Sequence, residues 1–119
     1  MIQNRIIIAG SRTCPEQNDE LFIKVHNIIH NLSDIEIVSG TAKGADRFGE
    51  CFANRLKIPL KRFPADWDTH GKSAGYVRNK QMAEYATHLI AIWDGKSKGT
   101  KNMIDLAKEY NLKTRVINF

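Results

Sequence analysis

Short apolar runs alternate with stretches of amphipathic spacing along the whole chain. The runs are rich in isoleucine and valine, which favour strands. Ile6, Ile7 and Ile8 follow one another without a polar residue, as in a parallel strand that is buried on both faces. The pattern therefore predicts five strands, at residues 5–9, 35–38, 58–63, 88–93 and 114–118.

The stretches between these runs predict amphipathic helices, because their apolar residues recur at helical spacing. The first helix is expected to begin at Thr13–Glu16, which has the T-x-x-E form of a capping box, and to keep its apolar face as far as Leu32. Thr100 is expected to cap the last helix. A polar loop is expected at residues 68–73, and the other helical faces lie in residues 45–56, 74–85 and 103–110.

Alternating strands and helices with short connections predict an α/β fold, a Rossmann-like domain with helices on both faces of a mostly parallel sheet. Pro59 lies inside the third predicted strand, which places that strand at a sheet edge. The expected strand order is 3-2-1-4-5. We expect residues 1–119 to form a single domain of this kind.

Glycine-bearing loops follow four of the five predicted strands. Right-handed crossovers bring the carboxyl ends of parallel strands to one edge of the sheet, so these loops should meet there. Gly40 and Gly44 lie between a buried strand and a helix, where free backbone N–H groups and the helix dipole favour an anion such as phosphate. The sequence therefore predicts one ligand site formed by residues 10–12, 40–46, 64–72 and 94–100.

Several side chains at this predicted site suit a nucleotide. Arg12 and Arg78 are able to clamp a phosphate in bidentate fashion, and Trp67 and Trp93 offer flat faces for a base. Asp46 or Asp66 is suited to accept hydrogen bonds from ribose or from a base amine. The predicted ligand-binding residues are Gly10, Ser11, Arg12, Ser39, Gly40, Thr41, Lys43, Gly44, Asp46, Asp66, Trp67, Arg78, Asn79, Trp93, Asp94, Gly95, Ser97, Gly99 and Thr100.

Composition narrows the class of ligand. The net charge of +5 favours anionic partners, phosphates or nucleic acid, without choosing between them. No apolar run reaches the roughly 18 residues that a membrane span requires. Two isolated cysteines and the pair His26 and His30 give neither a disulfide framework nor a metal pattern, so we expect no metal and a cytoplasmic location.

The same motifs resemble a known family. Together they are similar to the YspA-like branch of the SLOG superfamily, which groups the Smf/DprA proteins with the LOG proteins. The resemblance implies a Rossmann-like fold that binds nucleotides or nucleotide-derived signals at the predicted site, in bacteria or their phages. The motifs that carry it are residues 10–12, 39–46, 65–67, 74–82 and 93–100.

The resemblance leaves activity open. LOG-type relatives cleave the N-glycosidic bond of nucleoside monophosphates with a glutamate of a glycine loop, and Met103 stands at that position here. Methionine is neither an acid nor a base, so this chemistry does not carry over. DprA-like relatives bind single-stranded DNA. LOG relatives pair into dimers, and an exposed residue such as Ile23 would permit a homo-oligomer here.

Three functions follow as alternatives. The first is binding of a nucleotide or nucleotide-derived small molecule, with no certain cofactor. The second is a hydrolase that cleaves an N-glycosidic or phosphate bond of such a ligand. The third is a nucleic-acid-binding module. For the second, the candidate catalytic residues are Asp46, Glu50, Asp66 and His70.

Overall fold

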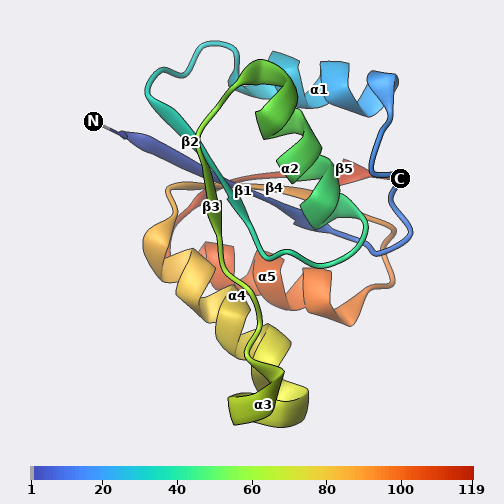
Figure 1. The fold of residues 1–119 in the computed structure, drawn as a ribbon, viewed down its shortest axis with the longest axis vertical. Coiled ribbons are helices and arrows are strands. Elements are labelled where there is room, and N and C mark those ends of the chain that lie inside the picture. The colour runs from blue at the N-terminus through green and yellow to red at the C-terminus, as the bar shows by residue number, and fades with distance from the viewer. Residues whose placement is uncertain (1) are drawn as a thin grey trace.

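The structure, a computed structural model, describes residues 2–119 and contains a five-stranded parallel sheet with the order β3-β2-β1-β4-β5 (Figure 1). The predicted α/β fold and strand order are confirmed. In the register of the central strand, Ile6 of β1 lies beside Ile37 of β2 on one side and His88 of β4 on the other. The strands are β1 (Asn4–Gly10), β2 (Ile35–Ser39), β3 (Leu60–Arg62), β4 (His88–Trp93) and β5 (Lys113–Asn118).

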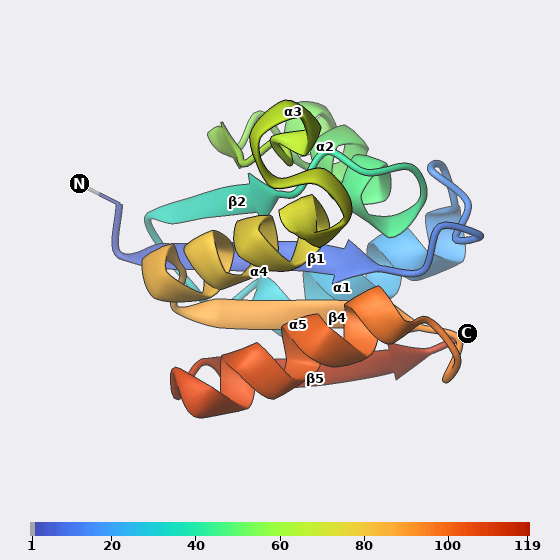
Figure 2. The same cartoon turned by 90° about the horizontal axis from the view of Figure 1, so that it is seen from below.

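Helices cover both faces of the sheet. Figures 1 and 2 show α1 and α2 on one face and α4 and α5 on the other, with the short α3 beside the start of α4. The helical elements are α1 (Asp19–Ile29), α2 (Ala45–Leu56), α3 (Trp67–His70), the 3₁₀ turn η1 (Gly71–Ser73), α4 (Ala74–Tyr85) and α5 (Lys98–Glu109).

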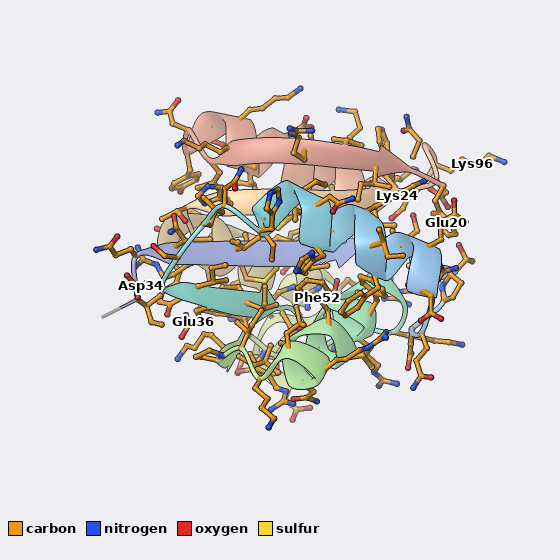
Figure 3. All side chains as sticks on the ribbon, turned by 90° about the horizontal axis from the view of Figure 1, so that it is seen from above. Glu20, Lys24, Asp34, Glu36, Phe52 and Lys96 are labelled. Carbon is orange, nitrogen blue, oxygen red and sulfur yellow. The ribbon has the colours of Figure 1, made fainter. Side chains whose placement is uncertain are left out.

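Two hydrophobic cores explain the uninterrupted apolar run of β1. Ile6 and Ile8 pack into the core beneath α1 and α2, whereas Ile7 packs into the core beneath α4 and α5. Successive residues of a strand point to opposite faces, so a strand with two covered faces needs an apolar residue at every position. In the first core the rings of Phe22 and Phe52 have centroids 4.8 Å apart, and Figure 3 shows Phe52 between α1 and α2.

The predicted start of the first helix is wrong. Helix α1 begins at Asp19, and Asn18 is its N-cap, because the Asn18 side chain accepts a hydrogen bond of 2.9 Å from the backbone N–H of Leu21. The sequence Thr13–Glu16 does not act as a capping box, since Cys14 is drawn into the core, where it is 3% exposed. The helix also ends at Ile29, so Leu32 packs against the core from the turn that follows.

Three other boundaries differ from the prediction. Ser97 rather than Thr100 caps α5, because its hydroxyl accepts from the Thr100 N–H, so that Thr100 lies in the first turn. The predicted polar loop at residues 68–73 is largely occupied by the end of α3 and by η1. Strand β3 lies at the edge as predicted, but it begins after Pro59.

Within residues 2–119, none of the helices has the length and apolarity needed to cross a bilayer. His26 is exposed on α1 and His30 is exposed just after its end, with ring centroids 6.3 Å apart. The described residues contain no cluster of three or more His, Cys, Asp or Glu side chains suited to a metal. Ile23 is 57% exposed on α1, while self-association itself stays a prediction.

Candidate functional site

A cavity of about 760 Å³ lies at the carboxyl ends of β1, β2 and β4. Figure 2 shows these strands pointing the same way, toward the loops that enclose it. Segments far apart in the sequence therefore meet at one place. The predicted residues that line the cavity are Gly10, Arg12, Gly40, Thr41, Lys43, Asp46, Trp67, Arg78, Asn79, Asp94, Ser97, Gly99 and Thr100.

The loop between β2 and α2 is tied back onto its own helix. The Asp46 carboxylate accepts a 3.2 Å hydrogen bond from the N–H of Ala42, and the Ser39 hydroxyl accepts one of 3.0 Å from the N–H of Thr41. Thr41 has a φ of 67°, a left-handed conformation that is uncommon for a β-branched residue. The polar side chains thus hold the loop in a defined shape around the cavity.

Gly44 brings this loop against the loop that follows β1. Its φ is 90°, and a Cβ built there would lie 2.4 Å from the backbone oxygen of Ser11. That oxygen also accepts a hydrogen bond from the N–H of Ala45. Glycine suits this position because it adopts the positive φ without strain and leaves room for the neighbouring backbone.

Arg78 connects α4 to the other segments around the cavity. One Nη atom donates to the backbone oxygen of Gly40, and its Nε donates to Asn79 Oδ1 at 2.9 Å. Asn79 in turn donates through Nδ2 to Asn102 Oδ1 at 3.0 Å and to the backbone oxygen of Gly99 at 3.3 Å. A continuous chain of hydrogen bonds therefore runs from the β2 loop through α4 to α5.

The Asp46 carboxyl is buried beside this chain. Asp46 is 5% exposed, and burial raises its pKa from 3.8 to about 6. Arg78 and the backbone N–H groups of Ala42 and Gly10 favour the charged form, while the carboxylate of Glu50 disfavours it. Burial also lowers the pKa of Arg78, which remains charged at neutral pH as arginine does throughout proteins.

Positive charge predominates at the cavity. Five cationic side chains line it against the two carboxylates of Asp46 and Asp94, an excess of three when both acids are ionised. Asp94 stays ionised, since hydrogen bonds from the backbone N–H groups of Lys96 and Ser97 hold its pKa below the usual value. The five cations are Arg12, Lys43, Arg47, Lys72 and Arg78.

Four predicted residues lie behind the cavity wall and not on it. Ser11 and Ser39 are buried, and Ser11 Oγ accepts a 3.0 Å hydrogen bond from the N–H of Asp94. Glu50 accepts hydrogen bonds from Ser39 Oγ at 2.8 Å and from Arg62 Nε at 3.1 Å. Together with Gly44, these residues hold the loops in position.

The other four predicted residues lie outside the lining. Asp66 is the exposed N-cap of α3 and accepts from the N–H of Thr69 at 3.1 Å, and His70 is exposed at the end of that helix. Trp93 turns its indole N–H to the backbone oxygen of Ser97 at 3.1 Å. Gly95 lies exposed in the loop before α5.

Further residues line the cavity that the sequence did not single out as ligand-binding. Arg47 lies in the first turn of α2 next to Asp46. Its position at the start of a helix that follows a glycine loop could have identified it from the sequence. Tyr76 lies on α4, and nothing in the sequence of that helix marked it as a ligand-binding residue. Met103 lines the cavity from α5. The remaining ones are Ala9, Thr13, Ala42, Pro64, Ala65, Lys72 and Gly75.

Comparison with known proteins identifies the family. The family model described as "YspA, cpYpsA-related SLOG family" matches residues 4–70, more than half of the chain. The chain belongs to this SLOG family. The resemblance predicted from the sequence motifs is therefore confirmed, and the match includes the two glycine loops that follow β1 and β2.

Two further matches cover nearly the whole chain. It is 30% identical over 124 residues to the Gene 61 protein of Mycobacterium phage D29, with 97% of this chain and 95% of that protein covered. The solved structure of DNA processing protein A (DprA) from Streptococcus pneumoniae matches with a TM-score of 0.74 and 18% identity. That match covers 99% of this chain but 51% of the DprA chain, and it shows that the fold is shared.

Proposed function

We propose that this SLOG protein binds a nucleotide or nucleotide-derived small molecule through its phosphate in the cavity at the carboxyl edge of the sheet. The observation that carries the proposal is the excess of three positive charges among the cavity-lining side chains. The volume of about 760 Å³ also suits this class, since small-molecule sites span roughly 300–1,000 Å³.

Two arginines are placed to hold a phosphate in different ways. Arg12 is exposed and free to reorient, so it is able to close on an anion with its bidentate fork. Arg78 is already fixed by its bonds to Gly40 and Asn79, so little conformational entropy is lost when it binds. The first turn of α2, which begins after Gly44, adds backbone N–H groups and the positive end of the helix dipole.

Calorimetric titration with AMP, ADP-ribose, a cyclic dinucleotide and unphosphorylated adenosine tests the proposal. We expect a phosphate-bearing compound to bind and adenosine to bind more weakly. Arg12→Ala should weaken binding by about 1.5–3 kcal/mol, the range for hydrogen bonds to charged groups. Arg115→Ala removes the same charge from an exposed position on β5 and should leave affinity unchanged. Absence of binding by the folded protein would contradict the proposal.

One observation favours a second candidate function, hydrolysis of the bound ligand. Of the four predicted catalytic residues, Asp46 alone lines the cavity, and its pKa of about 6 suits a general base near neutral pH. In such a reaction Asp46 takes a proton from water as the water oxygen bonds to the anomeric carbon. The base leaves with the electrons of the C–N bond and then receives that proton from Asp46. Chromatography of AMP and ADP-ribose after incubation with saturating protein should then show free base, and Asp46→Asn should abolish it.

Fewer observations support nucleic-acid binding. The net charge of +5 would attract any polyanion, whereas the likeness to DprA, at 18% identity, extends to the fold alone. Such binding predicts an affinity for a single-stranded oligonucleotide that falls steeply with salt. An oligonucleotide titration at two salt concentrations separates this alternative from a small-molecule site, whose affinity should change less.

A further inference from the structure

Two large aromatic side chains line the cavity while remaining open to solvent. Trp67 is the first residue of α3 and is 55% exposed, and Tyr76 lies near the start of α4 and is 47% exposed. Both belong to the lining of the cavity. Exposed aromatic rings that face a cavity provide flat apolar surface for a ligand ring.

Packing within the protein does not account for these rings. In the described part of the chain, neither Trp67 nor Tyr76 is a member of the two hydrophobic cores. Figure 1 shows α3 beyond the edge of the sheet, beside the start of α4 and on the far side of the molecule from α1. None of the α3 residues is buried. The helix is thus a small extension that carries Trp67 to the cavity.

The two walls of the cavity differ in chemistry. Arg12, Lys43 and Arg47 come from the segments after β1 and β2, whereas Trp67 and Tyr76 come from α3 and α4. Arg78 of α4 donates to Gly40 and so joins the two walls, and Lys72 of η1 is a cation on the aromatic side. A ligand that fits has an anionic end and a planar aromatic end.

We propose that Trp67 and Tyr76 form a base subsite, so that a nucleotide binds with its base against α3 and α4 and its phosphate toward Arg12. This inference rests on the proposed function and deepens it, because it assigns an orientation and distinguishes a nucleotide from a sugar phosphate. Ribose 5-phosphate has the anionic end without the base, so it would contact the cationic wall alone. The base must supply additional affinity through the aromatic wall.

The test compares AMP with ribose 5-phosphate on wild-type protein and four variants by calorimetry. Wild-type protein should bind AMP about 5- to 150-fold more tightly than ribose 5-phosphate, the range expected from stacking of a base on an aromatic ring. Trp67→Leu should remove most of this difference and leave ribose 5-phosphate affinity unchanged, Tyr76→Leu should reduce the difference, and Trp67→Phe should restore part of it. Phe119→Leu removes an aromatic ring that is 50% exposed outside the lining and should change neither affinity.

Intrinsic fluorescence gives a second readout on the same samples. Trp67 is exposed at the cavity, whereas Trp93 is half-buried with its indole N–H bonded to the backbone oxygen of Ser97. AMP should therefore quench the emission of wild-type protein but not of Trp67→Leu. Melting temperatures confirm folding, and an exposed side chain such as Trp67 should be replaceable without unfolding the protein.

The possible results separate the two proposals. Equal affinities for AMP and ribose 5-phosphate in wild-type protein, or a Trp67→Leu variant that keeps the difference, overturn the base subsite while phosphate binding stands. Failure of AMP and ribose 5-phosphate to bind, together with failure of ADP-ribose and the cyclic dinucleotide, overturns phosphate binding and, with it, the subsite. Loss of affinity for both compounds in folded Trp67→Leu also counts against the subsite, because a base contact cannot affect a ligand without a base.

Discussion

The guanidinium of Arg78 donates a hydrogen bond to the backbone carbonyl of Gly40, which precedes it by 38 positions in the sequence. This bond joins α4 to the loop after β2, and Asp46 lies against the same glycine. Arginine has five N–H donors in a rigid fork, so a residue that anchors a loop with one edge keeps donors for a ligand. The side chain proposed to contact phosphate also fixes the shape of the cavity.

Gly40→Ala should destabilise the protein and weaken ligand binding. A Cβ at this position would lie 2.7 Å from both an Nη atom of Arg78 and a carboxylate oxygen of Asp46, so these groups must move apart. We expect a loss of about 1–3 kcal/mol in the free energy of unfolding, typical of overpacking, measured by urea denaturation. Gly99→Ala is the matched control, because a Cβ there meets none of the described atoms within 4 Å. Equal stabilities of the two variants would contradict the prediction.

Asp46→Asn should stabilise the protein relative to wild type as the pH rises. The folded-state pKa of about 6 is above the ordinary 3.8, so the contribution of Asp46 to stability is fully present below about pH 4 and is lost as the pH rises through 6. The variant does not ionise and escapes this loss, which corresponds to roughly 2–3 kcal/mol for a pKa change of this size. Urea denaturation of both proteins at pH values from 4 to 7 measures this loss of stability. A difference in free energy of unfolding that stays constant across that range would refute the raised pKa of Asp46.

Asn79→Ala should weaken phosphate binding through Arg78. The amide oxygen of Asn79 accepts from the Arg78 Nε at 2.9 Å, and its removal leaves the guanidinium held by the Gly40 carbonyl alone. Calorimetry should show that Asn79→Ala and Arg78→Ala are not additive, because residues in one hydrogen-bond network typically couple by about 0.5–3 kcal/mol. Asn54→Ala, at an exposed position on α2, is the control. Strict additivity would mean that Asn79 acts independently of Arg78.

Ser97→Ala should destabilise α5. The Ser97 hydroxyl accepts a hydrogen bond from the Thr100 N–H at 3.3 Å and another from the Thr100 hydroxyl at 2.9 Å. Loss of an N-cap serine costs about 0.5–2 kcal/mol, which thermal or urea denaturation would detect. Ser33→Ala, at an exposed position between α1 and β2, should be neutral. A neutral Ser97→Ala would mean that the Ser97 hydroxyl does not stabilise α5 measurably.

The sequence predicted the sheet well because burial on both faces leaves an uninterrupted apolar run. The apolar run Ile6–Ile8 is typical of a buried strand and of few other structures. The strand order that results brings the glycine loops together. Helix starts were harder, since a capping box is a local signal that tertiary packing overrides. The burial of Cys14 in the core shows this override at Thr13–Glu16.

The sequence predicted the glycine and arginine residues of the cavity better than the aromatic residue Tyr76 that helix α4 contributes to it. Gly40 and Arg78 were expected at one site from the topology alone, and the structure brings them into hydrogen-bond contact. Tyr76 was not predicted to bind a ligand, because the sequence pattern around an exposed helical aromatic residue is the same whether its side chain faces solvent or a cavity. Helix α3 is too short, at four residues, to leave a periodic pattern.

Met103 is one of three α5 residues that line the cavity, together with Gly99 and Thr100. Its thioether neither delivers nor withdraws a proton, so a glycosidic bond resting against it lacks a partner for cleavage on that side. If no other residue, such as Asp46, assists cleavage, a bound ligand would leave the protein as the same compound that entered. Its lifetime in the cavity would then be set by the rate of dissociation.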